Sequence, residues 1–171
     1  MFCALTSGRL DLAPEFADLG GSPAGTTPEL WIHGTGPRSA ALAARLGMSL
    51  GTSLFHHFSV DDPSHVRRYR DEFRPRAEGD APRAVVGVAG VCAPTAEAAR
   101  AIESGFTNSF IKPTVVGDPR QCAEQLHAIA DRYDVDEVLF LGTCDRLEDR
   151  VACYELLAEA LGVRADADGS G

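Results

Sequence analysis

A short glycine turn, Gly34-Thr35-Gly36-Pro37-Arg38, is the part of the sequence best suited to bind a ligand. An extended apolar run over residues 29–33 precedes it, and an amphipathic stretch beginning at Ser39 follows it. Glycine lets the backbone come close to a ligand, and proline fits the first turn of a helix, where its missing N–H costs nothing. The remaining N–H groups and the helix dipole favour an anion at such a turn. The pattern predicts a phosphate site, and its alternative is an ordinary loop that caps a helix.

Three histidines lie near the ends of expected strands. His56 and His57 close the second apolar run, and His33 stands two residues before Thr35. Alternation along a strand would turn one of His56 and His57 toward the inside of the fold and the other outward. An inward histidine can act as a general acid or base near neutral pH. The other interpretation is a hydrogen-bonded structural histidine, and the sequence shows no partner that would complete a catalytic triad.

The composition predicts one soluble domain. The chain has 171 residues, 44% of them hydrophobic and 24% charged, with a net charge of -9. This acidity argues against a nucleic-acid surface, and the arginines between residues 67 and 76 alternate with acidic residues, as on a solvated helix face. No apolar stretch approaches a membrane span and no secretory signal is visible, so we expect a cytoplasmic protein without membrane contact. Five cysteines without a CxxC pair indicate reduced thiols and no metal site.

The order of apolar runs and helical patterns predicts an α/β fold. We expect strands at 29–34, 50–56, 83–93 and 136–142, and helices at 37–46, 61–73, 95–104, from 118 onward and at 146–161. Asp118, Pro119 and Gln121 form a capping-box pattern. Such alternation gives a parallel sheet with right-handed crossovers. The expected organisation is an irregular segment 1–27, a domain 28–162 and a disordered tail 163–171, with residues 104–117 as a long connection.

Several segments, in order, resemble the C-terminal part of the bacterial luciferase-like, flavin-dependent monooxygenases. These segments are 28–36, 39–47, 54–59, 115–126, 136–141 and 150–161. The resemblance implies about four βα units, corresponding to the C-terminal half of a TIM-type (β/α)8 barrel. It also implies reduced FMN, or a deazaflavin, as cofactor. The turn after the fifth barrel strand would hold the flavin phosphate through Thr35, Gly36 and Ser39, with Gly34 and Arg38 beside them.

The resemblance leaves the N-terminal half of the barrel, with the family's active-site histidine, without a counterpart here. Four parallel strands alone expose unpaired edges and an apolar inner face. We therefore expect a homodimer or a partner chain that completes the barrel, a flavin reductase as supplier, and a small organic substrate. The leading hypothesis is a flavin-dependent monooxygenase active only as an assembly. The alternative is a truncated, non-catalytic homologue that binds a flavin or a partner.

Overall fold

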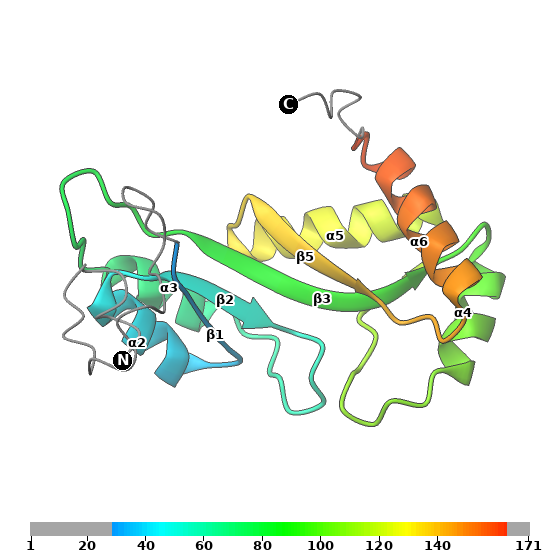
Figure 1. Cartoon of the computed structure of the whole chain (residues 1–171), viewed down its shortest axis with the longest axis horizontal. Coiled ribbons are helices and arrows are strands. Elements are labelled where there is room, and N and C mark those ends of the chain that lie inside the picture. The colour runs from blue at the N-terminus through cyan, green and yellow to red at the C-terminus, as the bar shows by residue number, and fades with distance from the viewer. Residues whose placement is uncertain (1–28, 164–171) are drawn as a thin grey trace, which may run out of the picture. The chain divides into compact units, whose positions relative to one another are not determined.

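The computed structural model describes residues 29–163, in which five parallel strands alternate with five helices (Figure 1). The strands are β1 (Trp31–Gly34), β2 (Ser49–Ser53), β3 (Ala84–Cys92), β4 (Val115–Gly117) and β5 (Glu137–Gly142). The helices are α2 (Pro37–Leu46), α3 (Ser64–Asp71), α4 (Ala96–Gly105), α5 (Pro119–Tyr133) and α6 (Leu147–Ala160). The α/β class and the parallel order predicted from the sequence are confirmed. The predicted segment 1–27 and residues 164–171 of the predicted tail lie outside the described residues.

β3 is the central strand of the sheet. Its first residues pair with β2, its last residues pair with β4, and β5 runs along its other edge. β1 pairs with β2 and extends the sheet on that side. Since all these strands are parallel, the carboxyl ends of the strands and the loops that follow them lie at the same end of the sheet. Parallel α/β folds place their binding sites at the carboxyl ends of the strands.

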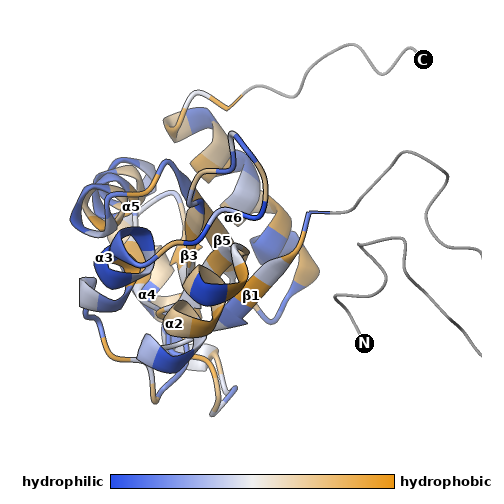
Figure 2. Cartoon of the chain, turned by 90° about the vertical axis from the view of Figure 1, so that its left-hand side faces the viewer, coloured by the Kyte–Doolittle hydropathy of each residue, from blue (hydrophilic) through white to orange (hydrophobic). Residues whose placement is uncertain are grey.

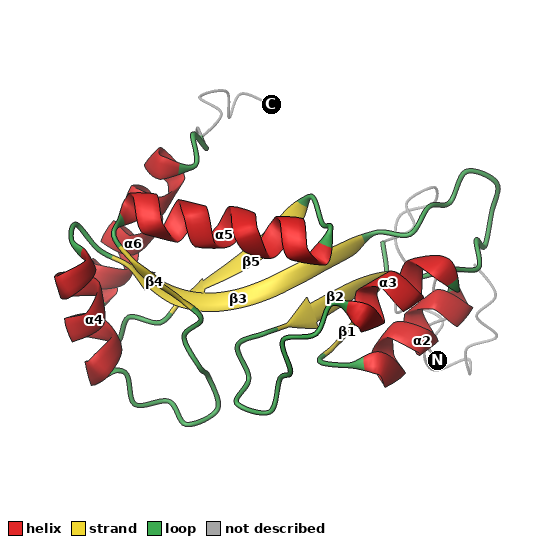
Figure 3. Cartoon of the chain, turned by 180° about the vertical axis from the view of Figure 1, so that it is seen from behind, coloured by secondary structure: helices red, strands yellow, loops and turns green. Residues whose placement is uncertain are grey.

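Helices cover one face of the sheet. The apolar core on this face joins Leu50, Val86 and Val88 of the strands to α2, α3, α5 and α6. Figure 3 looks onto this face, where α2 and α3 lie beside β1 and β2, and α5 lies beside β3 and β5. In Figure 2, α3 carries hydrophilic residues on the side turned away from the strands. We call this the helix face.

The opposite face, which we call the inner face, is seen in Figure 1, and no helix of residues 29–163 crosses β3 and β5 there. Leu139 and Leu141 of β5 point to it and are 56% and 39% exposed. Their neighbours Val138 and Phe140 point the other way and pack on the helix-face core. Strand alternation explains the contrast. β5 is therefore apolar on both faces but covered on only one.

Local sequence signals fix the starts of three helices. Asp118 and Gln121 form the predicted capping box of α5, and the Thr95 hydroxyl accepts a 3.1 Å hydrogen bond from the Ala98 N–H at the start of α4. Helix α3 begins at Ser64, three residues after the expected 61. Its first N–H donates a 2.9 Å hydrogen bond to Oδ1 of Asp62, which precedes the N-cap residue Pro63.

Two strands differ from the prediction. β2 ends at Ser53, three residues before the expected end, so His56 and His57 lie on the following loop and strand alternation does not orient them. β4 falls within residues 104–117, where we expected only a connection. It pairs at Gly90, where an added β-carbon would stand 1.9 Å from the Val115 carbonyl oxygen. Glycine at this position is therefore what lets β4 approach β3.

Within the part of the chain that the structure describes, no helix combines the length and the apolar character needed to cross a lipid bilayer.

Candidate functional site

The predicted phosphate turn lies between the end of β1 and the start of α2. Gly36 occupies the N-cap position in an extended conformation, and Pro37 is the first helical residue. The Gly36 carbonyl accepts the first helical hydrogen bond, from Ala40 N–H at 3.3 Å. The N–H groups of Arg38 and Ser39 have no acceptor among residues 29–163. Two free donors at the positive end of a ten-residue helix therefore lie at the turn.

Gly34 and Ser39 are in direct contact across this turn. A β-carbon on Gly34 would stand 2.3 Å from Ser39 Oγ and 2.5 Å from Ser39 Cβ, which no side chain tolerates without movement. The Ser39 hydroxyl donates a 2.8 Å hydrogen bond to the Gly36 carbonyl. Because its proton is already used, this hydroxyl must turn away from Gly36 before it can donate to a bound anion. Gly34 thus keeps the turn tight, and the backbone N–H groups are the donors ready for a ligand.

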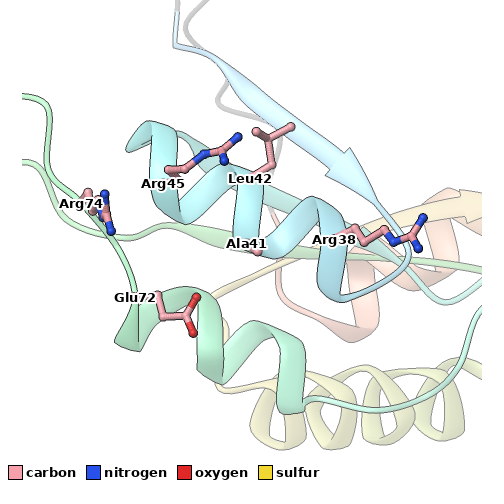
Figure 4. A pocket seen from close by; sticks show the side chains of 6 residues that line it. All are labelled: Arg38, Ala41, Leu42, Arg45, Glu72 and Arg74. Atoms are coloured by element: carbon pink, nitrogen blue, oxygen red, sulfur yellow. The ribbon is translucent and has the colours of Figure 1, made fainter.

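Arg38 supplies positive charge beside the turn. Its side chain is exposed and, in Figure 4, its guanidinium points past the start of α2 and away from Arg45 and Arg74. These three arginines line an open hollow of about 790 Å³ between α2 and the end of α3, together with Leu42 and Glu72. The hollow lies beside the outer surface of α2, on the far side of that helix from the inner face of the sheet. Of the predicted site residues, Arg38 alone borders it.

The inner face beside the turn carries a histidine bound to a serine. His33 of β1 lies next to Gly51 of β2 in the strand register, and its Nε2 is 2.9 Å from Ser53 Oγ. A β-carbon on Gly51 would stand 2.6 Å from His33 Cδ2, so the ring occupies space that a side chain would fill. His33 is a candidate from the sequence, whereas Gly51 and Ser53 carry no sequence signal of their own. The signal that finds them is the strand register, which places alternate residues of β1 and β2 on the same face.

His56 and His57 do not join the turn through any contact in the described structure. His56 lies near two aromatic rings, with ring centroids 4.6 Å from Phe55 and 5.1 Å from Phe58, the latter stacked. Its backbone forms an isolated antiparallel bridge with Ile111. His57 is exposed, and no side-chain partner is found for it between residues 29 and 163. These contacts hold two loops together, and a catalytic role for either histidine stays a prediction.

The buried cysteines are packed in the core. Cys92, Cys122, Cys144 and Cys153 are free and buried. Cys153 Sγ accepts a hydrogen bond from the Cys92 N–H at 3.1 Å. Burial raises the pKa of the Cys122 and Cys144 thiols to about 12, so neither is a thiolate nucleophile at neutral pH. No three His, Cys, Asp or Glu side chains of the described residues are grouped to hold a metal ion.

Sequence comparison finds relatives about twice as long as the matched part. No family model matches the chain. The uncharacterized protein YwcH of Bacillus subtilis is 29% identical over 196 residues, covering 91% of this chain and 58% of YwcH. The uncharacterized protein YceB of the same organism is 28% identical over 170 residues, covering 79% of this chain and 50% of YceB. The chain therefore spans about half the length of the curated relatives it matches.

Structure comparison gives the fold class. The crystal structure of apo-MsnO8 matches with a TM-score of 0.70 and 25% identity, over 83% of this chain and 53% of MsnO8. Monooxygenase RslO1 from Streptomyces bottropensis matches with a TM-score of 0.58 and 19% identity, over 79% and 47% of the two chains. The oxygenating constituent of 3,6-diketocamphane monooxygenase from Pseudomonas putida, in complex with FMN, matches with a TM-score of 0.53 and 15% identity, over 78% and 48%.

These matches confirm the predicted resemblance. Two of these solved structures are monooxygenases by name, and one of the two was solved in complex with FMN. The chain corresponds to about half of each of them. In this chain the glycine turn lies at the carboxyl end of β1.

Proposed function

We propose that the chain is the C-terminal half-barrel of a luciferase-like, flavin-dependent monooxygenase and that its 34–39 turn holds the phosphate of FMN. The observation that carries this proposal is the pair of unbonded N–H groups of Arg38 and Ser39, which lie at a helix N-terminus and at the carboxyl end of β1. A helix N-terminus alone would be weak support. The shared fold with flavin-dependent proteins, among them one solved in complex with FMN, supplies the second and independent support.

The turn can bind the phosphate only weakly by itself. Hydrogen bonds to a charged group contribute about 1.5–3 kcal/mol each. Two such bonds from the backbone, together with the exposed Arg38 guanidinium, must offset the entropy of association. The balance corresponds to an affinity of about millimolar order, near -4 kcal/mol. Tight binding therefore requires an apolar pocket for the flavin ring.

A complete barrel would supply that pocket. Leu139 and Leu141 are exposed on the inner face, and β5 has an unpaired edge within the described sheet. A second copy of the chain, or a partner chain with the missing strands, would pair with this edge and cover the leucines. A two-fold axis along the barrel keeps all strands parallel, which makes a homodimer geometrically possible.

In such an assembly the chain's residues would bind, orient and shield the cofactor. Reduced flavin, delivered by a separate reductase, would supply the reaction with oxygen that places one oxygen atom on a small organic substrate. The turn would anchor the phosphate, and the inner-face leucines would help to exclude water from the reacting centre. A reduced deazaflavin is the second cofactor that the resemblance implies.

A fluorescence titration of FMN with the purified chain, carried to millimolar protein, tests this proposal. We expect saturable quenching that added inorganic phosphate reverses. A micromolar dissociation constant, together with a dimer in sedimentation, would support self-assembly and catalysis, whereas millimolar affinity of a monomer would favour a partner chain. Absence of saturable quenching would contradict the flavin site. Binding without flavin-dependent oxygen uptake, even with a partner, would favour the non-catalytic alternative.

A further inference from the structure

We infer that His33 is a ligand-contacting residue of the proposed flavin site and that Ser53 positions its ring. This inference rests on the proposed function and deepens it. It assigns to His33 the hydroxyl-bearing ribityl chain that joins the phosphate of FMN to the flavin ring. The His33 side chain is exposed and yet held in one orientation.

Two contacts hold the His33 ring on the inner face. Ser53 Oγ lies 2.9 Å from Nε2, and the Cδ2 corner of the ring lies against the Cα of Gly51, where a β-carbon would come within 2.6 Å. Ser53 is only 1% exposed, whereas His33 is exposed. A buried hydroxyl therefore fixes a ring whose other edge, with Nδ1, faces away from β2.

The neighbouring residue of β2 makes the same kind of pair on the opposite face. Thr52 Oγ1 lies 3.0 Å from His65 Nε2, and both residues are buried between β2 and α3. Burial lowers the pKa of His65, and its ring lies near Tyr133 in the helix layer. That pair is a satisfied part of the core. The His33–Ser53 pair has the same bond, but its ring lies on the open face, so core packing does not account for it.

The position of His33 indicates which part of a ligand it would meet. It directly precedes Gly34, so its Cα lies about 3.8 Å from the first residue of the phosphate turn. For a ligand whose phosphate lies on the Arg38 and Ser39 N–H groups and whose chain extends along the inner face, the atoms next to the phosphate are the first to pass His33. In FMN these atoms are the ribityl hydroxyls. A histidine Nδ1 that has no partner among residues 29–163 can donate to or accept from a hydroxyl.

NMR spectroscopy of the full chain with labelled histidine tests this contact and tolerates millimolar affinity. The His33 ring resonance is assigned by its loss in His33→Gln. FMN and ribitol 5-phosphate, which lacks the flavin ring, should both shift this resonance together with the Gly36 and Ser39 amides. Inorganic phosphate should shift the amides alone. The ring of His127, exposed on α5, is the internal control for non-specific effects.

The outcomes separate this inference from the proposed function. If FMN shifts the turn amides but leaves the His33 ring unchanged, His33 is not a ligand contact, while the phosphate site stands. If FMN shifts neither, both proposals are wrong. If FMN shifts the His127 ring as much as that of His33, the effect is non-specific and the inference also fails.

A matched pair of variants tests the role of Ser53. Ser53→Ala should change the tautomer balance of His33, read from its ring nitrogen shifts, and weaken ribitol 5-phosphate binding about threefold or more while inorganic phosphate binding is retained. Thr52→Val removes the corresponding hydroxyl from the core pair with His65 and should change neither His33 nor either ligand. An unchanged His33 tautomer balance in Ser53→Ala, or equal losses in both variants, would overturn the positioning role.

Discussion

Gly34 and Ser39 are packed so closely that a β-carbon on Gly34 would lie 2.3 Å from the Ser39 hydroxyl oxygen. This contact links the last residue of β1 to the first turn of α2 and sets the shape of the proposed phosphate site. Glycine is needed here because of a neighbour rather than because of an unusual backbone angle. The contact predicts the effects of two substitutions in this turn.

Gly34→Ala should distort the turn, whereas Gly36→Ala should not. The alanine methyl at 34 must displace Ser39, and overpacking of this kind costs about 1–3 kcal/mol of unfolding free energy. A β-carbon on Gly36 meets no heavy atom within 4 Å, and its extended backbone suits any residue. Urea unfolding should therefore show a loss for Gly34→Ala and little change for Gly36→Ala. FMN quenching should weaken at least tenfold in Gly34→Ala, and undiminished binding in that variant would contradict the assigned turn.

Arg38 and Arg45 should differ in their effect on FMN binding. Both line the hollow beside α2, but Arg38 is the second residue of the helix and lies at the turn, whereas Arg45 lies two turns further on. An exposed charge pair is worth about 0.2–1 kcal/mol and is screened by salt. Arg38→Ala should weaken FMN binding about two- to fivefold at low salt and less at high salt, and Arg45→Ala should leave it unchanged. Equal losses would place the anion in the hollow instead of the turn.

Buried His65 should make stability depend on pH. Burial lowers its pKa in the folded protein below the ordinary value near 6.5. Between these two pKa values the unfolded chain binds a proton that the folded protein does not, so the free energy of unfolding rises with pH. Stability should therefore fall as the pH is lowered from 7 to 5. Urea unfolding of His65→Gln should show a shallower pH dependence, and an unchanged slope would contradict this role.

Leu139→Lys should prevent assembly without harming the fold. Leu139 is 56% exposed on the inner face, where a lysine remains solvated in the monomer. In a closed barrel the charge would be buried without a partner, which costs several kcal/mol. Sedimentation velocity should show the unsubstituted chain associated and the variant monomeric. Val60→Lys is the control, since Val60 is 68% exposed in the loop before α3. A compact monomer of the unsubstituted chain at micromolar concentration would contradict self-association.

Local signals account for the parts of the fold that the sequence predicted well. Asp118, Pro119 and Gln121 lie within four positions and form the observed capping box, so the start of α5 needs no tertiary information. The same holds for Pro37 at the start of α2. β4 was not predicted, because a strand of three residues is too short to show an alternating pattern of apolar and polar residues. Its pairing with β3 depends on the close approach of Val115 to Gly90, 25 positions away.

The candidate site likewise combines features that the sequence predicts with features that only the structure shows. The donors of the 34–39 turn follow from its sequence, because a glycine turn before a proline-led helix leaves N–H groups free. The bond from Ser39 to the Gly36 carbonyl, which occupies the hydroxyl proton, is not visible in the sequence. The pair of His33 and Ser53 joins residues 20 positions apart, and it required the register of β1 with β2. The histidines chosen from the end of the second apolar run lie instead on a loop, because β2 ends early.

The most direct test of the phosphate turn compares FMN with riboflavin, which carries the same ring and ribityl chain but no phosphate. Both are titrated into the purified chain under identical salt and pH, and fluorescence quenching is recorded. If the Arg38 and Ser39 N–H groups hold the phosphate, FMN should bind at least tenfold more tightly, a difference of about 1.4 kcal/mol or more. Equal affinities for the two flavins would contradict the account.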